Sequence, residues 1–512
     1  CFVQPLGSAL TAGAPRGADP MRDGASLPCV YAALSQAAQT LHLGGGVGID
    51  YSSLAPRGTG PQDAQGAAPG PVATLRLFEG LSTFLAGFGR RGAAQMAVLR
   101  CDHPDIAAFL AAKAASGLQH VSLAVAVTDA FMVALQSGRS IDLVHDSAPS
   151  PYAPSSAGSP RRSPAGGWVH DQMPAAAGWR TLVQQAHARG DPGVLFIDRI
   201  NADNNLGYCE HIAATNPCGE QPLPAYGGCC LGSIDLPQLV RRPFESGAWV
   251  DIRRLRQLVP VAVRMLDNVL DLTAWPLPEQ KAQALSTRRI GLGFTGLSDM
   301  LAMLGLHYAD PLARAVAANV ARHLRDTAYE ASIDLARERG AFARLDAEGL
   351  LRPNTAASRL PAALRDRIRR EGLRNSHLLC VAPAGSISLA FADNTSSGIE
   401  PPLAWGASLS RRRAPAGVRP EDPVADRAWR LHQTLHGPHT AFPPTLTTAL
   451  GVSPQAHLEM VGAVAPYIDG SIAKTINLAT DCSTEHIDAL LRRAWRLGLK
   501  GLTVFRPPEA TV

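Results

Sequence analysis

Apolar residues recur at two different spacings along this 512-residue chain, and the two spacings alternate through most of its length. Val121, Leu123, Val125 and Val127 occupy every second position, which predicts a strand, and the short apolar run 194–197 predicts another. Helical spacing recurs in two long stretches, at Leu255, Leu258, Ala262, Met265, Leu266 and Val269, and at Leu312, Val316, Val320 and Leu324, with the second closing near Gly340. This alternation favours an α/β fold over an all-α or all-β fold.

The composition restricts the class of protein. Hydrophobic residues make up 46% and charged residues 18%, and no apolar run is long enough to cross a bilayer. The net charge of +5 suits phosphorylated substrates, but the longest basic run is only Arg411–Arg413, so we expect no nucleic-acid partner. Since the sequence shows no secretory signal, we expect a cytoplasmic protein, in which cysteines are more often free or catalytic than bridged.

We expect a single domain over residues 1–512, because no internal repeat and no clear linker divides the chain. The segment 147–167 is crowded with Pro, Ser, Gly and Ala, which predicts a flexible insertion. The segment 411–423 is predicted to be a surface loop. The chain opens at Cys1 without a methionine, which indicates a piece of a longer protein.

The densest group of reactive side chains is the run Asn216-Pro217-Cys218-Gly219-Glu220, followed by Cys229 and Cys230. An amide, a thiol and a carboxylate occupy alternate positions, so in an extended loop all three would project to one side and converge on a small molecule. A turn around a buried cysteine is the alternative interpretation. A zinc site is disfavoured because no Cys-x-x-Cys occurs, and we predict no metal ligands.

Ordered motifs extend over nearly the whole chain. They are GGGVGID at 44–50, RRGAAQM at 90–96, FIDRIN at 196–201, NPCGE at 216–220, RRIGLG at 288–293 and SSGIEP at 396–401. With these motifs the sequence resembles the large-chain family of the ribonucleotide reductases. The resemblance implies a ten-stranded α/β barrel with the catalytic cysteine on a central finger loop.

The resemblance also implies roles for particular residues. Cys218 would be the thiyl radical that abstracts the ribose 3′ hydrogen, Glu220 the general base on the 3′ hydroxyl, and Asn216 a hydrogen-bonding partner of the substrate. Cys1 and Cys229 would supply two electrons by closing to a disulfide, which yields a 2′-deoxyribonucleotide. Related cobalamin enzymes typically have Asn at position 230, so Cys230 stays open as the alternative partner of Cys1.

Two further sites follow from the resemblance. The substrate phosphate would bind at Ala384, Gly385, Ser386, Ile387 and Ser388, a turn of small residues whose N–H groups can approach an anion, although the family usually has Thr at 384. Gly45, Gly46, Arg90 and Arg91 would belong to loops that contact the substrate and a specificity effector, and residues 50–65 would clasp the effector. Ser8 stands where the family often has an effector-binding Asp.

The segment 500–506 indicates how the radical is made. Family members that import it from a diiron small chain have two neighbouring tyrosines here, whereas this chain has Thr503 and Val504, which cannot relay an oxidation. This favours adenosylcobalamin as the cofactor, and the Tyr226 region, 398–400 and 471–477 also resemble the cobalamin-dependent branch.

The implied partners are a ribonucleoside diphosphate, a deoxynucleoside triphosphate effector, thioredoxin or a similar dithiol, and a second copy of the chain in a homodimer, with no membrane contact. The alternatives are a large chain that depends on a small subunit, and a degenerate protein that binds nucleotides without turnover.

Overall fold

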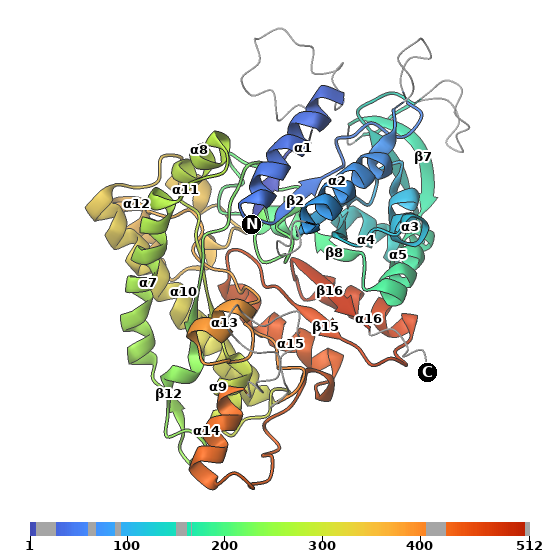
Figure 1. The fold of residues 1–512 in the computed structure, drawn as a ribbon. Helices are drawn as coiled ribbons and strands as arrows, with labels where there is room; N and C mark the ends of the chain where they lie inside the picture. Colours follow the sequence, from blue (N-terminus) through green and yellow to red (C-terminus); the bar gives the residue numbers. More distant parts are fainter. Residues whose placement is uncertain are drawn as a thin grey trace.

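The computed structural model describes residues 1–6, 27–59, 68–87, 94–149, 161–164, 166–405 and 426–506. Its main sheet has seven strands in the order β1-β2-β3-β4-β8-β16-β15 (Figure 1). The first five run parallel: β1 (Phe2–Gln4), β2 (Val47–Asp50), β3 (Gln95–Arg100), β4 (Val121–Val127) and β8 (Gly193–Phe196). β16 (Gly501–Phe505) is antiparallel to β8, and β15 (Thr475–Asn477) is parallel to β16. Both predicted strands are confirmed, although Ile197 already belongs to the next helix.

The parallel strands are buried on both faces, as is usual for a parallel sheet inside an α/β protein. In β4 the alternate residues Val121, Leu123, Val125 and Val127 belong to a large outer core, while Ala124 and Ala126 belong to a smaller inner cluster. β3 repeats the pattern, with Leu99 outside and Val98 inside. The inner residues are small in β4, which leaves space on that side of the sheet for another element.

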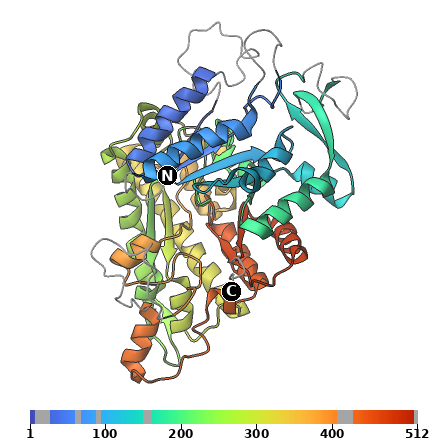
Figure 2. The ribbon, with the colours of Figure 1, turned by 45° about the vertical axis from the view of Figure 1, so that its right-hand side comes forward.

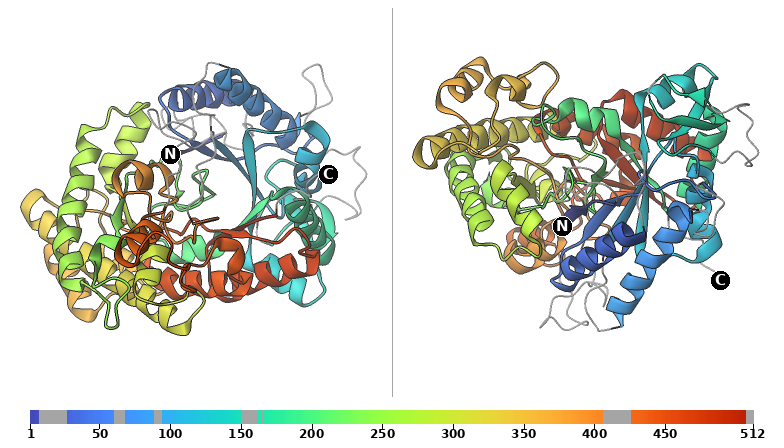
Figure 3. Two further views of the ribbon diagram at one scale, coloured as in Figure 1. Left: turned by 60° about the horizontal axis from the view of Figure 1, so that its bottom comes forward. Right: turned by 90° about the horizontal axis from the view of Figure 1, so that it is seen from above.

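Helices cover the outer face of this sheet (Figures 2 and 3). They are α1 (Leu27–His42), α2 (Gly70–Ala86), α3 (Ile106–Ser116), α4 (Asp129–Gln136) and α5 (Ala175–Arg189). The short helix α6 (Ile197–Asp203) follows β8, and its buried residues Ile197 and Ile200 belong to the inner cluster instead. A separate antiparallel sheet contains β5 (Ser140–His145), β6 (Arg161–Arg162) and β7 (Trp168–Pro174). β6 lies in the predicted insertion 147–167, of which residues 150–160 and 165 are outside the described part, as is the whole segment 411–423.

A second group of parallel strands adjoins the main sheet at both of its edges. β11 (Leu231–Asp235) pairs with β14 (Gly291–Thr295), and single parallel bridges continue from Leu292 to Leu379 and from Val381 to Ile472, just before β15. At the other edge, Phe2 of β1 forms an antiparallel bridge with Gly228, just before β11. β15 and β16 run parallel with this second group and are counted in it, so the two groups of parallel strands meet at β8 and β16 and run in opposite directions. The mixed α/β class predicted from the sequence is confirmed.

The stripe predicted at 255–269 is partly wrong. In α7 (Ile252–Leu272) the side chains of Leu255, Val259, Val263, Leu266 and Leu270 are buried, and the helix packs against α10 (Pro311–Arg339). Met265 and Val269 are 54% and 41% exposed. Each precedes a buried residue by one position, which turns it about 100° away from the buried face.

In α10 the predicted Val320 and Leu324 are buried and the helix ends before Gly340, as expected, but Leu312 in its first turn is 61% exposed.

The remaining helices surround the second group of strands (Figure 3). They are α8 (Pro278–Thr287), α9 (Leu297–Met303), α11 (Ala347–Leu350), α12 (Ala362–Glu371), α13 (Gly385–Phe391), α14 (Arg427–His436), α15 (Pro454–Val464) and α16 (Thr484–Arg496). A short hairpin is formed by β12 (Val240–Arg241) and β13 (Trp249–Val250). Among the helices that the structure describes, none has both the length and the apolar character needed to cross a membrane.

Candidate active site

Cys218 lies at the tip of a small hairpin made of β9 (Ala214–Thr215) and β10 (Pro222–Leu223). The hairpin tip is a tight turn, because the Gly219 N–H donates to the Asn216 carbonyl at 3.0 Å and the Asn216 N–H donates to the Gln221 carbonyl at 3.2 Å. Gly219 has a φ of +82°, which L side chains adopt only with strain. The expectation of an extended loop is therefore wrong, because these bonds close residues 216–221 into a turn.

The hairpin lies against the inner face of the main sheet. A Cβ atom on Gly48 of β2 would be 1.8 Å from the Thr215 carbonyl oxygen, so only glycine permits this approach. A Cβ atom on Gly46 would lie 2.9 Å from the Cys1 Sγ and 3.1 Å from Pro217. The hairpin tip and the starts of β1 and β2 therefore meet at one place, and the predicted Gly45 and Gly46 lie beside it.

Asn216 and Glu220 are buried on either side of Cys218. The Asn216 amide oxygen accepts the Gln221 N–H at 2.9 Å, which orients the amide. The Asn216 Nδ2 and the Glu220 Oε2 are buried and have no hydrogen-bond partner among the described residues. Because a buried polar atom without a partner costs free energy, these two atoms are suited to bind a molecule that enters the site.

The Cys218 side chain is exposed, and yet desolvation and the neighbouring Glu220 carboxylate raise its pKa to about 11. A thiol that solvent reaches but that protein atoms largely surround lies in a recess. Burial also raises the pKa of Glu220. The recess therefore holds a protonated thiol next to a carboxyl group of increased basicity.

Cys1 and Cys229 lie opposite one another on neighbouring backbone segments. The Phe2–Gly228 bridge and the bond from the Cys229 N–H to the Cys1 carbonyl, 2.8 Å, fix this pairing. Residues opposed in a hydrogen-bonded antiparallel pair have Cα atoms about 5.5 Å apart, which is within the range that a disulfide spans. Cys230 instead donates from its Sγ to the Leu266 carbonyl of α7 at 3.5 Å, on the far side of the segment.

Burial, with Glu220 and Cys218 nearby, raises the pKa of Cys229 to about 12. The structure thus brings Cys1, Cys218, Glu220 and Cys229 together, and directs Cys230 away from them.

The predicted phosphate loop lies where the Leu378–Val381 segment ends and α13 begins. Ala384 is the N-cap of α13 and provides no side-chain cap, while Gly385 and Ile387 are exposed. The Ser388 hydroxyl is buried and donates to the Thr395 carbonyl. This loop follows the carboxyl ends of the second strand group, which is antiparallel to the first, so it lies at the same edge as Cys1. Arg90, Arg91 and Ser8 are outside the described residues.

The matched family, described as "Ribonucleotide reductase, barrel domain", covers residues 20–505. The chain belongs to the ribonucleotide reductases. A vitamin B12-dependent ribonucleoside-diphosphate reductase of Mycobacterium tuberculosis is 35% identical over 94% of the chain, and one of Thermoplasma acidophilum is 30% identical over 100%. The chain spans 66% and 62% of the length of these two relatives. A ribonucleoside-diphosphate reductase large chain of Encephalitozoon cuniculi is 24% identical over 77% of the chain and 53% of the relative.

Two features of this ribonucleotide reductase site escaped the sequence analysis. Cys380, which the motifs of the sequence did not single out, is buried near Glu220 and Cys229, and burial and these neighbours raise its pKa. Lys474, which is 1% exposed, pairs with Glu400, and Glu400 also accepts the Thr475 N–H at 2.8 Å. The pair joins the SSGIEP motif to β15 across 74 residues of sequence. The only available signal was the presence of a Lys and a Glu in two motifs of the same family.

Proposed function

We propose that the protein to which this chain belongs reduces ribonucleoside diphosphates to 2′-deoxyribonucleotides by thiyl radical chemistry with adenosylcobalamin. The main support is the placement of one exposed thiol, Cys218, between two buried groups without partners and close to the opposed pair Cys1 and Cys229. The names of the Mycobacterium and Thermoplasma relatives support the substrate class and the cofactor.

The chemistry balances with the residues present. The Cys218 thiyl takes the 3′ hydrogen atom of the ribose and returns one at the end. Glu220 accepts the proton of the 3′ hydroxyl and gives it back to the 3′ oxygen when the product forms. The 2′ hydroxyl leaves as water, and the two thiols of Cys1 and Cys229 supply two electrons and two protons as they close to a disulfide. Asn216 Nδ2 holds the ribose in place, and the turn at 384–388 receives the phosphates.

Two observations on the described residues fit adenosylcobalamin as the source of the radical. Cys218 presents an exposed, protonated thiol at the tip of the hairpin, and Thr503 and Val504 offer no side chain that could carry an oxidation from elsewhere. Adenosylcobalamin supplies, when bound, the radical that removes the thiol hydrogen atom. Cys218 is the residue that would face it.

We further infer that the two strand groups close into a ring of ten. The observed pairings lead from β1 through β2, β3, β4 and β8 to β16, then through 472–477, 379–381 and β14 to 228–235, which returns to β1. The hairpin 214–223 would then be enclosed as the finger loop, which keeps a radical away from bulk water.

Other parts of the proposal rest on the family. A deoxynucleoside triphosphate effector, thioredoxin or a similar dithiol, and a second copy of the chain are the expected partners. Exposed apolar side chains on α1 and α2, among them Tyr31 and Phe84, support a dimer contact there. None of the nine cysteines, all of which lie in the described part of the chain, forms a disulfide, which supports a reducing compartment such as the cytoplasm.

The test is reduction of CDP by the full-length protein with adenosylcobalamin and dithiothreitol, with dCDP measured by chromatography. Wild-type protein should form dCDP only when the cobalamin is present, and Cys218→Ser should form none while unfolding at a similar temperature. Cys101→Ser, a buried thiol in the outer core, serves as the control that keeps activity. Equal turnover by Cys218→Ser, or turnover without the cobalamin, would contradict the proposal.

A further inference from the structure

A large cavity opens at the end of the barrel away from Cys218. Its volume is about 600 Å³, within the range of small-molecule sites. It is bordered by Arg199, Ala202 and Asp203, which follow the carboxyl end of β8, and by residues 497–501 at the start of β16. Cys1 and Gly46 precede the amino ends of β1 and β2, which run parallel with β8, so the cavity and the candidate active site lie at opposite ends.

The polar side of the cavity is rich in cations. Arg199, Arg359 and Lys500 line it together with a single carboxylate, Asp203. Asp203 is shared, since it pairs with Arg359 and also accepts from Lys500 at 2.6 Å. One carboxylate thus pairs with two cations, so the polar wall of the cavity has a net positive charge.

Of the three cations, Arg199 has the most unused hydrogen-bonding capacity. Its Nε is buried and has no hydrogen-bond partner among the described residues, although the Asp129 carboxylate lies 3.3 Å away. Its guanidinium lies 5.6 Å from the centre of the Trp495 ring, which helps to hold it in place. A planar guanidinium held in this way suits a carboxylate or phosphate group.

Much of the remaining wall is apolar, although Asn354, Ser358 and Ser471 also line the cavity. Val461, Ala465, Ile468, Ile472 and Leu497 face the same cavity. An occupant that buried these side chains from water would gain hydrophobic stabilisation in addition to its ion pairs. The lining therefore combines a cationic end with an apolar body, which is the usual composition of a site for a small organic anion.

We propose that this cavity binds a small organic anion, a carboxylate or phosphate carried on an apolar or aromatic body. The site is separate from the proposed reduction chemistry and does not depend on it. None of the three polar groups of the candidate active site, Asn216, Cys218 and Glu220, lines the cavity.

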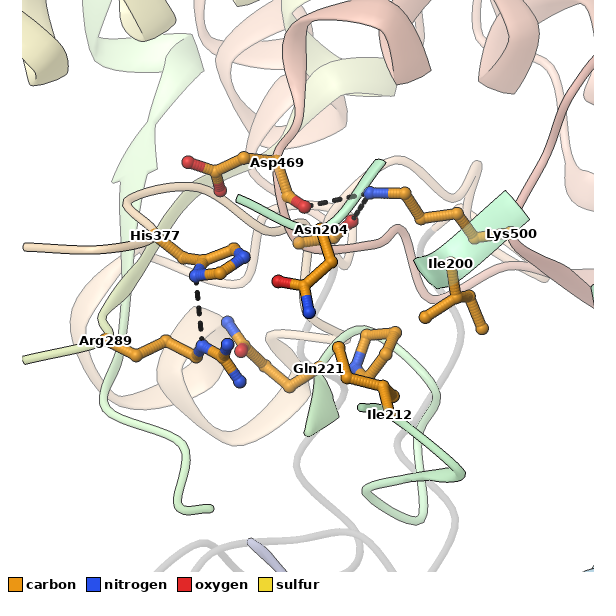
Figure 4. Close-up of a pocket in the computed structure, with 10 residues that line it drawn as sticks. Ile200, Asn204, Ile212, Gln221, Arg289, His377, Asp469 and Lys500 are labelled. Carbon is orange, nitrogen blue, oxygen red and sulfur yellow. Dashed lines mark hydrogen bonds between the residues drawn. The ribbon is translucent and has the colours of Figure 1, made fainter. Parts of the chain in front are cut away.

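The wall of this cavity is also attached to the finger hairpin. Gly470 and Lys500 line both this cavity and a second, much smaller one. Figure 4 shows the smaller cavity, which Gln221, Arg289 and His377 also line. The Ser471 N–H, from the same wall, donates to the Glu220 carbonyl at 2.9 Å. A bound anion would therefore rest on the segment that holds the turn at the tip of the finger.

The probe for this site is 8-anilinonaphthalene-1-sulfonate, an aromatic body with one anionic group, added to the full-length protein and followed by fluorescence. We expect saturable binding of one probe per chain that CDP does not compete for. Arg199→Gln should weaken it by about tenfold through loss of a charged hydrogen bond. Ala465→Trp, which fills the cavity, should abolish it. Phenyl phosphate and benzoate are then tested as competitors, and displacement by either one supports the site and identifies the preferred head group.

Arg162→Gln is the matched control, because Arg162 is also stacked on a tryptophan, 4.4 Å from the Trp168 ring centre, but lies on β6 outside the cavity. It should bind the probe like the wild type. Thermal unfolding of each variant shows whether it is folded, and Arg199→Gln carries the test if Ala465→Trp is not. Unchanged probe affinity in both cavity variants, or failure of both competitors to displace the probe, would overturn the proposal.

Discussion

Cys218 combines accessibility to solvent with surroundings that keep its thiol protonated. A reactive thiolate would be alkylated or oxidised, whereas a thiol is the form from which a hydrogen atom can be removed. The recess formed by the hairpin and by Glu220 provides both conditions. The desolvated surroundings of Cys218 therefore favour loss of a hydrogen atom over reaction as a thiolate.

The raised pKa predicts slow alkylation of Cys218. A shift of the pKa from 9.0 to about 11 leaves roughly 100-fold less thiolate at neutral pH. Iodoacetamide labelling of Cys218, followed by peptide mass spectrometry, should be slower than labelling of glutathione by about that factor. The rate should rise about tenfold per pH unit up to pH 10, because the thiolate fraction grows in proportion below the pKa. In denaturant the difference should disappear; equal rates in the folded protein would contradict the assignment.

The two adjacent cysteines should behave differently. We predict that Cys229→Ser abolishes steady-state turnover and that Cys230→Ser keeps most of it, because only Cys229 lies opposite Cys1. After one turnover without external dithiol, peptide mapping should recover a Cys1–Cys229 disulfide. A Cys1–Cys230 disulfide would show that the backbone pairing at Phe2 and Gly228 shifts during the reaction.

At this scale the sequence indicated which residues matter but gave their arrangement only in part. The resemblance singled out Asn216, Cys218 and Glu220, yet their alternation suggested an extended loop and the structure has a turn. The choice between Cys229 and Cys230 depends on a bridge to Phe2, 226 positions earlier than Gly228, which no local pattern can indicate.

The finger hairpin, as an element, depends on small residues in the strands that it touches. Gly48 permits contact with Thr215, and Ala124 and Ala126 leave space on the inner face of β4. Local spacing predicted β4 correctly because its large apolar residues alternate with Ser and Ala, which are the small residues of the inner face. The stripe of α7 was harder to predict, because Met265 and Leu266 are both apolar and only packing against α10 shows which of them is buried.

Substitutions of glycine should separate close approach from backbone strain. Gly48→Ala should lower the free energy of unfolding by about 3 kcal/mol or more, because its methyl group would overlap the Thr215 carbonyl. Gly219→Ala, at positive φ but with open space around it, should cost only about 1 kcal/mol. Gly80→Ala, inside α2 and also in open space, should stabilise by about 0.5–1 kcal/mol. Urea unfolding measures all three, and equal costs for Gly48→Ala and Gly219→Ala would refute the close contact.

At the scale of the whole molecule, the structure is organised around two groups of parallel strands. The two groups run in opposite directions and are joined by few residue pairs. Two residue pairs connect β16 to β8, and a single bridge connects Phe2 to Gly228, whereas β3 and β4 share six pairs. The α/β class could be predicted from periodicity, but these joints could not, because they link residues far apart in sequence. The buried pair Lys474 and Glu400 was unpredictable for the same reason.

Assembly of two copies should depend on the exposed apolar side chains of α1 and α2. Tyr31→Glu combined with Phe84→Glu should convert a dimer into a monomer, because a carboxylate buried in an apolar contact lacks a partner. Sedimentation velocity at micromolar concentration gives the mass. Met265→Glu, which alters an equally exposed position on α7, is the control that should stay dimeric. A dimer that survives the double substitution would place the contact elsewhere.

Each of the two strand groups is drawn from one continuous part of the chain, since β8 ends at Phe196 and the second group begins near Gly228. A ribosome therefore synthesises every strand of the first group before it makes the residues around Cys218. Until residues 214–223 emerge, the inner face that includes Ala124 and Ala126 lacks Ala214 and Leu223, and only Ile197 and Ile200 of α6 can cover it. During that interval the exposed apolar face makes the growing chain prone to aggregation, and we expect a chaperone to bind it then.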